Sequence, residues 1–146
     1  MKIAVSACLL GDNVRYDGTN KFNEVLVSLL EGHEIIRICP EAMVFLIPHL
    51  PIEIQDGRIT DSDGFDHTQD MTIACEKCLA QIEGCDFVIL KSKSPSCGIG
   101  RVYDGSFSGK LIEGDGVFAS MCKKKKIVLC DENDLERIKA LLNGQR

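Results

Sequence analysis

The chain has 146 residues, of which 45% are hydrophobic and 27% charged, and it carries eight cysteines. This length and balance predict one globular domain over residues 1–146 and exclude a disordered, collagen-like or coiled-coil protein. A net charge of −5 and the lack of a long apolar run argue against a general nucleic-acid binder and against a membrane protein. We therefore expect a cytoplasmic protein whose cysteines are reduced thiols and not disulfides.

Four short apolar runs rich in β-branched residues alternate with segments of helical periodicity. The runs cover residues 3–7, 35–38, 87–91 and 127–130. Their continuous hydrophobicity is typical of strands buried on both faces. The helical patterns cover about 20–32, 71–84, 115–125 and 132–143. Strand alternating with helix predicts an α/β fold, a Rossmann-like doubly wound parallel sheet of about four main strands with flanking helices.

Two of the four helical patterns and two long connections carry further detail. The first helix is expected to begin at Asn20 and to bury a stripe that starts with Phe22 and Val25. The second buries Cys75 and Cys78 on its apolar stripe. The connection over 40–70 contains a hairpin pattern at 52–60, where the Asp-Gly pair suits a type I′ turn. Connections of this length, like the one over 95–114, are usually functional.

Three cysteines follow three of the predicted strands. Cys8 comes directly after the first strand, Cys39 after the second, and Cys97 a few residues after the third. Ligands of open α/β sheets bind beyond the carboxyl ends of the strands, so we expect these three thiols to meet in space. The other five cysteines have structural interpretations as packing residues: Cys75, Cys78, Cys85, Cys122 and Cys130.

Three converging thiolates are compatible with two kinds of metal site, a zinc ion or an iron–sulfur cluster. Zinc would need a fourth ligand or a water, and His33, His49 and His67 are candidates only in principle. An iron–sulfur cluster fits three cysteines if one iron has no protein ligand, and that open position would allow chemistry on a substrate. Four basic residues near these motifs are able to offset the negative charge of such a cluster: Arg15, Lys91, Lys93 and Arg101.

Several motifs, taken in this order, resemble a bacterial family known as domain of unknown function 523. They are SACLLG at 6–11, VRYDG at 14–18, CPE at 39–41, GFDHT at 64–68, KSKSPSCG at 91–98, YDG at 103–105 and GDGV at 114–117. The resemblance covers nearly the whole chain. It implies a [4Fe-4S] cluster held by Cys8, Cys39 and Cys97, with one iron not ligated by the protein.

The resemblance also implies a reaction. The family's activity is a non-redox desulfidase reaction, in which water replaces the sulfur of a small thiolated heterocycle such as thiouracil and hydrogen sulfide leaves. Glu41 matches the family's acid/base glutamate and Ser96 its active-site serine. Candidate substrate contacts in the same motifs are Arg15, Asp17, Lys93 and Ser94.

The chain departs from the family pattern directly after Cys39-Pro40-Glu41. The family usually has a Gly-Gly-Leu element and an arginine near prolines, whereas residues 42–53 here are more apolar and lack the arginine. We expect this segment to line the pocket and to affect the choice of substrate. We expect the partner to be a small thiolated molecule, and we expect neither a nucleic acid nor a membrane as a partner. The alternatives are a lyase or hydrolase that uses the open iron on another small molecule, and a metal- or thiol-sensing module without turnover.

Overall fold

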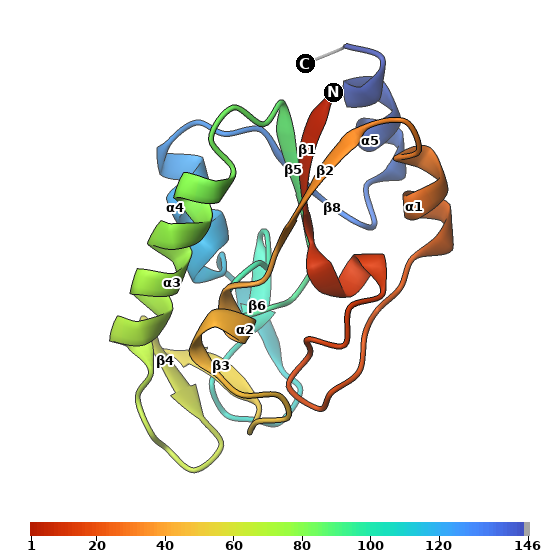
Figure 1. Cartoon of the computed structure of the whole chain (residues 1–146). Coiled ribbons are helices and arrows are strands. Elements are labelled where there is room, and N and C mark those ends of the chain that lie inside the picture. The colour runs from red at the N-terminus through yellow and green to blue at the C-terminus, as the bar shows by residue number, and fades with distance from the viewer. Residues whose placement is uncertain (145–146) are drawn as a thin grey trace.

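The computed structural model describes residues 1–144 and is organised around one parallel sheet (Figure 1). Its strands are β1 (Lys2–Ser6), β2 (Glu34–Ile38), β5 (Phe87–Leu90) and β8 (Leu129–Asp131). They pair in the order β2-β1-β5-β8, and every pair is parallel. The α/β class and the parallel sheet of four main strands predicted from the sequence are confirmed.

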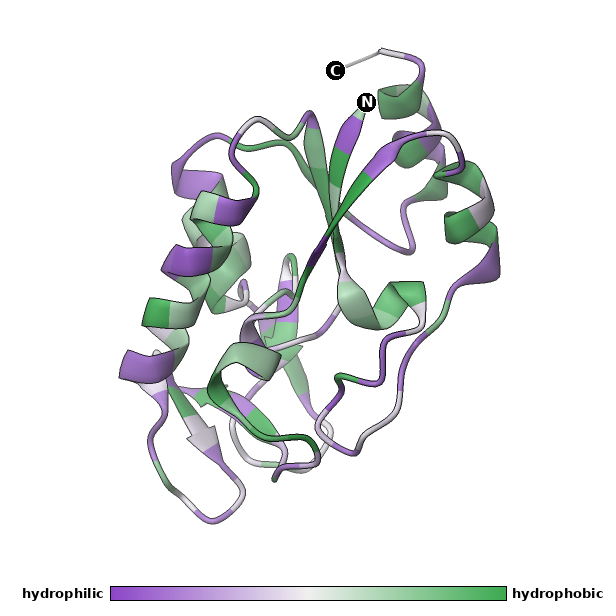
Figure 2. Cartoon of the chain, viewed as in Figure 1, coloured by the Kyte–Doolittle hydropathy of each residue, from purple (hydrophilic) through white to green (hydrophobic). Residues whose placement is uncertain are grey.

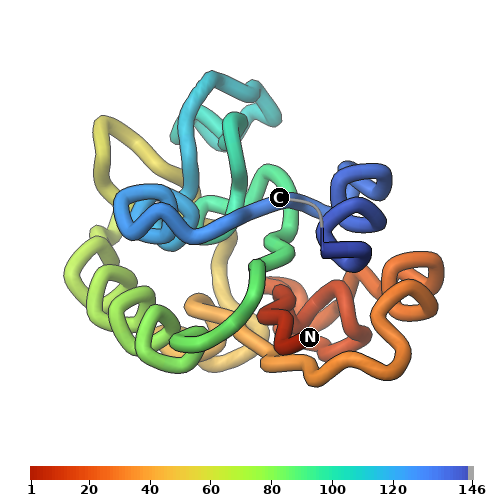
Figure 3. The backbone as a smooth tube through the Cα atoms, turned by 90° about the horizontal axis from the view of Figure 1, so that it is seen from above, coloured from red at the N-terminus to blue at the C-terminus, as the bar shows by residue number. Residues whose placement is uncertain are grey.

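Helices cover both faces of this sheet (Figures 1 and 3). On one face lie α1 (Glu24–Leu29) and α5 (Leu135–Leu142), and on the other lie α3 (Thr68–Gln81) and α4 (Val117–Lys124). Successive strand residues point to opposite faces, so Ile3 packs in the α1 and α5 core and Ala4 in the α3 and α4 core. Figure 2 shows the strands to be largely hydrophobic, whereas the helices mix both kinds of residue. No helix within residues 1–144 is long and apolar enough to cross a bilayer.

The remaining elements gather at the carboxyl ends of the strands. They are the 3₁₀ helix η1 (Ala7–Leu10), the short helix α2 (Pro40–Val44), and two hairpins. The first hairpin pairs β3 (Ile52–Gln55) with β4 (Arg58–Asp61), and its turn has φ of 51° at Asp56 and 78° at Gly57. Two successive positive φ angles confirm the predicted type I′ turn. The second pairs β6 (Arg101–Tyr103) with β7 (Leu111–Glu113), and the sequence did not predict it.

The start of α1 differs from the prediction. Asn23 and not Asn20 caps the helix, because the Asn23 side-chain oxygen accepts the Leu26 N–H at 3.0 Å. The Asn20 side-chain oxygen instead accepts the Phe22 N–H at 2.9 Å in a local turn. Phe22 is 54% exposed and Val25 56% exposed, so the predicted stripe was wrong at both positions.

The last strand and the last helix also begin later than predicted. The Ile127 N–H bonds to the Cys122 carbonyl at 3.0 Å, which ties residue 127 to the end of α4 and delays β8 to Leu129. Glu132 turns its carboxylate back to Ser92 and does not start the final helix. α5 therefore begins at Leu135.

Candidate functional site

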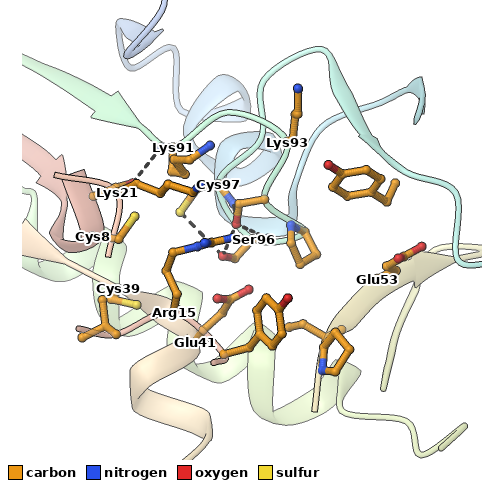
Figure 4. Close-up of a pocket in the computed structure, with 18 of the residues that line it drawn as sticks. Cys8, Arg15, Lys21, Cys39, Glu41, Glu53, Lys91, Lys93, Ser96 and Cys97 are labelled. Atoms are coloured by element: carbon orange, nitrogen blue, oxygen red, sulfur yellow. Dashed lines mark hydrogen bonds between the residues drawn. The ribbon is translucent and has the colours of Figure 1, made fainter. Parts of the chain in front are cut away.

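A cavity of about 710 Å³ lies at the carboxyl edge of the sheet (Figure 4). Its floor comes from the ends of β1, β2 and β5, and its walls from the segment after β5 and from both hairpins. The chain leaves β1 toward β2 on one side and later fills the other side with β5. Ligands of open α/β sheets bind at such a reversal of strand order, so the fold itself places the site here.

The three cysteines that follow strands all line this cavity. Cys8 lies in η1, Cys39 is the N-cap residue of α2, and Cys97 lies in the loop after β5. Figure 4 shows their side chains on the same side of the cavity, with Arg15 reaching toward them from its loop. The structure thus brings together the three thiols that strand position singled out.

Burial makes each of these thiols a poor acid when no positive partner is bound. It raises the pKa of Cys8 to about 11 and of Cys39 to about 12, and it raises the pKa of Cys97 well above its usual value. The Lys91 ammonium and the Arg15 guanidinium act in the opposite direction on the pKa of Cys8. A cationic group bound by all three sulfurs would remove the cost of burying thiolates.

The loop that carries Cys97 is shaped by serine hydroxyls. Ser94 Oγ accepts the backbone N–H groups of Ser96 at 3.2 Å and Cys97 at 3.1 Å, which closes a tight turn. Ser96 is 1% exposed, and its hydroxyl donates to Cys97 Sγ at 3.6 Å. Ser6, at the end of β1, accepts the Lys91 N–H at 2.9 Å, and its hydroxyl lowers the pKa of Cys97.

The N-terminus of α4 holds the same loop from behind. The Val117 N–H donates to the Pro95 carbonyl at 3.0 Å and the Phe118 N–H to the Ser96 carbonyl at 2.8 Å. The loop carbonyls therefore take the place of a side-chain cap for the free N–H groups of the helix. Gly116 makes this approach possible, because a Cβ there would lie 2.5 Å from the Ser96 carbonyl carbon.

Gly116→Ala is expected to lower the free energy of unfolding by about 1–3 kcal/mol, because the added methyl group must push the backbone of Ser96 away. Urea unfolding followed by circular dichroism measures the change. Ser120→Ala in the same helix is the matched control and is expected to stay within about 0.5 kcal/mol of the unchanged protein. An unchanged midpoint for Gly116→Ala would contradict the close packing of α4 against the loop.

A partly buried ion pair fixes the segment before this loop. Lys91 Nζ lies 3.1 Å from Glu132 Oε2, with side chains only 20% and 10% exposed. Glu132 also accepts the Ser92 N–H at 2.8 Å and the Ser92 hydroxyl at 3.0 Å. The β8–α5 connection thereby holds the Lys91 ammonium at the cavity wall, near Cys8.

Glu41 is the carboxylate closest in sequence to the thiols. It lies in the first turn of α2, two residues after Cys39, and lines the cavity. Burial raises its pKa to about 7, while the Arg15 guanidinium acts to lower it. The second carboxylate of the lining, Glu53, is held elsewhere, because it accepts the N–H groups of Gly105 at 3.0 Å and Phe107 at 3.2 Å.

The candidate substrate contacts divide into two groups. Arg15, Lys93 and Ser94 line the cavity. Asp17 is not among the lining residues, and its exposed carboxylate accepts the Thr19 N–H at 3.1 Å. Arg101, one of the four basic residues expected near a cluster, also lies outside the lining.

The segment that departs from the family pattern lines the cavity only at its end. Pro51, Ile52 and Glu53 contribute to the lining, whereas residues 42–50 do not. The expectation that the whole segment lines the pocket was therefore wrong. α2 and the loop after it run over α3, where Cys78 Sγ donates to Met43 Sδ at 3.5 Å.

Further lining residues escaped the sequence interpretation, and they are Ser6, Tyr16, Lys21, Glu53, Tyr103 and Phe107. Three of them lie in recognised motifs, since Ser6 opens the first cysteine motif, Tyr16 follows Arg15, and Tyr103 opens the YDG motif. Lys21 and Phe107 lie in segments with no motif, and only the folded chain brings them to the cavity. Glu53 lies at the end of the segment 42–53, which was expected to line the pocket.

The other cysteines pack within the protein, and the histidines form hydrogen bonds away from the cavity. Four of the remaining cysteines are buried in the two cores: Cys75, Cys78, Cys122 and Cys130. Cys85 is half-buried. Packing is therefore confirmed for the four buried thiols. None of the histidines lines the cavity, and each has a local partner: His33 the N-terminal amine, His49 the Leu50 carbonyl and His67 the Asp61 carboxylate.

The three thiols share one cavity without forming a compact ligand group. Within residues 1–144, no group of three or more His, Cys, Asp or Glu side chains is close enough together to hold a single metal ion. Zinc gathers its sulfurs at about 2.3 Å from one atom, which is a tighter grouping than these side chains form in the structure. An iron–sulfur cluster is larger and takes one thiolate at each iron, which suits three separated sulfurs around one cavity.

A doubly wound α/β domain with thiols, a carboxylate and cations around one cavity at its strand ends has the architecture of a small-molecule enzyme. Residues 3–134 match the family described as 2-thiouracil desulfurase. The chain is 36% identical over 149 aligned positions to the uncharacterised protein YbbK of Bacillus subtilis strain 168, covering 93% of this chain and 99% of that protein.

A solved structure leads to the same family. The [4Fe-4S]-dependent thiouracil desulfidase TudS superimposes with a TM-score of 0.89 at 35% identity, covering 97% of each chain. The chain therefore belongs to the 2-thiouracil desulfurase family, enzymes that cleave a carbon–sulfur bond.

Proposed function

We propose that this chain is a [4Fe-4S]-dependent, non-redox desulfidase that removes sulfur as hydrogen sulfide from a small thiolated heterocycle such as thiouracil. The observation that carries the proposal is the convergence of Cys8, Cys39 and Cys97 on one cavity that also contains Glu41 and Ser96. The similarity to TudS supports the choice of cluster and of reaction.

The three cysteines would hold the cluster, and their number leaves one iron without a protein ligand. When bound, the cluster supplies at that iron a Lewis acid able to take the sulfur of a thiocarbonyl group. The positive lining suits a cluster with three thiolate ligands, because the lining itself carries four cations, Arg15, Lys21, Lys91 and Lys93, against two carboxylates, and among the described residues only Lys91 is paired with a further carboxylate behind it, Glu132. The net reaction turns a C=S group and water into a C=O group and hydrogen sulfide, so it needs no electron donor or acceptor.

The protein must move protons between water and the departing sulfur. Glu41 is the carboxylate available for this task, since Glu53 is engaged by two backbone N–H groups. We assign Glu41 as the general base that takes a proton from the attacking water and returns it to the leaving sulfur. The Ser96 hydroxyl, beside Cys97, is placed to donate a hydrogen bond at the reacting centre.

The cavity walls would hold the heterocycle. Tyr16, Tyr103 and Phe107 offer aromatic faces in the lining, which suit a flat ring. Arg15 and Lys93 present donors for the carbonyl or thiocarbonyl groups of such a ring. The proposed site does not include Asp17, which lies outside the lining.

Anaerobic reconstitution with iron and sulfide, followed by incubation with 2-thiouracil or 4-thiouracil, tests the proposal. We expect sulfide and uracil to appear in equal amounts, over many turnovers and without an added reductant. Protein that binds the cluster and the thiouracils but releases no sulfide would identify a sensing module. A requirement for a stoichiometric reductant would contradict the non-redox reaction.

A further inference from the structure

The hydrogen-bond pattern around Ser94 fixes the direction of its hydroxyl proton. A serine hydroxyl has one proton to donate and two lone pairs that accept. Ser94 Oγ accepts the N–H groups of both Ser96 and Cys97, at 3.2 Å and 3.1 Å, and these two donors occupy both lone pairs. The contact of 3.0 Å between Ser94 Oγ and Ser96 Oγ must therefore be a hydrogen bond donated by Ser94.

The same reasoning fixes the next proton in the series. Because Ser96 Oγ accepts from Ser94, its own proton points away from Ser94 and toward Cys97 Sγ, 3.6 Å away. Ser96 is 1% exposed, so little bulk water competes for this proton. The order of donation is Ser94 to Ser96 to Cys97.

We propose that Ser94 is a positioning residue, whose hydroxyl aims the proton of Ser96 at the sulfur of Cys97. This inference rests on the proposed function, in which Cys97 is a cluster ligand and Ser96 acts at the reacting centre. It replaces the expectation that Ser94 contacts the substrate, because the hydroxyl of Ser94 is fully engaged within its own loop.

The arrangement has a consequence for the cluster itself. Hydrogen bonds to a ligating sulfur stabilise the more negatively charged, reduced cluster, so they raise its reduction potential. With Ser94 replaced by alanine, the Ser96 hydroxyl is free to rotate away from Cys97. The potential then becomes more negative, as it does when the Ser96 hydroxyl is removed outright.

A double-mutant cycle separates this role from simple bracing of the turn. The variants are Ser94→Ala, Ser96→Ala, the double variant, and Ser94→Thr, which keeps the hydroxyl. Each is reconstituted anaerobically, and the midpoint potential of the cluster is measured by dye-mediated titration with visible and electron paramagnetic resonance spectra. Circular dichroism checks that each variant folds.

Ser94→Ala and Ser96→Ala are each expected to shift the potential to more negative values, and Ser94→Thr to retain the original value. The double variant is expected to match Ser96→Ala, because Ser94 acts through Ser96. In turnover, Ser94→Ala is expected to lower kcat roughly ten-fold with KM unchanged, since a proton and not a substrate contact is misplaced.

Three results would overturn the proposal. They are additive shifts in the double variant, an unshifted potential in Ser94→Ala, and a folded Ser94→Ala protein that no longer takes up the cluster. The potential is measured without substrate, so a chain that holds the cluster but releases no sulfide contradicts the proposed function alone. Unchanged protein that takes up no cluster contradicts both.

Discussion

Alanine at Cys8, Cys39 or Cys97 is expected to abolish retention of the iron–sulfur cluster in each single variant. Two remaining thiolates from two strand ends would leave half of the irons without a protein ligand, in a cavity open to solvent and small thiols. Iron and acid-labile sulfide per protein, with the visible spectrum of anaerobic samples, measure the loss.

Two cysteines in the α3 core provide the matched controls. Cys75 and Cys78 are fully buried among apolar residues and line no part of the cavity. Alanine at either position removes a packed sulfur and is expected to cost about 1–2 kcal/mol of stability while the iron content stays unchanged. Full iron content in any variant of the first set would refute the ligand assignment at that position.

Glu41→Gln is expected to keep the cluster and to lower kcat by roughly 10²–10⁴-fold. The amide matches the carboxylate in size but cannot take a proton from water, and the stated range is typical of a lost general base. Steady-state sulfide release, normalised to iron content, measures the effect.

Asp17→Asn is the matched control for this substitution. The Asp17 carboxylate lies outside the cavity lining and is bound to Thr19, so its neutralisation is expected to leave kcat within about two-fold. Turnover of Glu41→Gln equal to that of the unchanged protein would remove Glu41 from the reaction. A parallel loss of iron would show that Glu41 supports the cluster and not the proton transfer.

The two central strands were predictable because they are hydrophobic on both faces. Residues 3–5 of β1 and 87–90 of β5 are 0–1% exposed, and no polar residue interrupts either run. The second hairpin was not predictable, because its strands have only three residues each and the turn that joins them contains glycine at 105 and 109. The β6–β7 unit is held by long-range contacts, such as the bond from the Gly105 N–H to Glu53, which local propensity does not encode.

The cysteine trio was predictable for a topological reason, and the rest of the cavity was not. Residues that follow a parallel strand lie at the carboxyl edge of the sheet, so strand assignments place Cys8 and Cys39 together, and the serine turn after β5 brings Cys97 to the same edge. Glu132 has no such signal. It reaches Ser92 across 40 residues of sequence because β5 and β8 are neighbours, and that pairing becomes visible only in the folded chain.

The predicted start of α1 was wrong because two asparagines are equally suitable as its N-cap residue. Asn20 and Asn23 both suit an N-cap, and both accept a nearby backbone N–H in the structure. Only the chain before α1, tied to η1 by the bond from the Asn23 N–H to the Leu9 carbonyl at 3.1 Å, decides between them. The exposed Phe22 follows from the same constraint.

The wide separation of the three thiols along the chain has a consequence for biosynthesis. Residues 8, 39 and 97 become neighbours only after β1 has paired with both β2 and β5. A ribosome must therefore deliver about two thirds of the 146 residues before the proposed ligand set exists. Parallel pairing of distant strands is slow relative to local structure, so the proposed ligand set is completed late in folding.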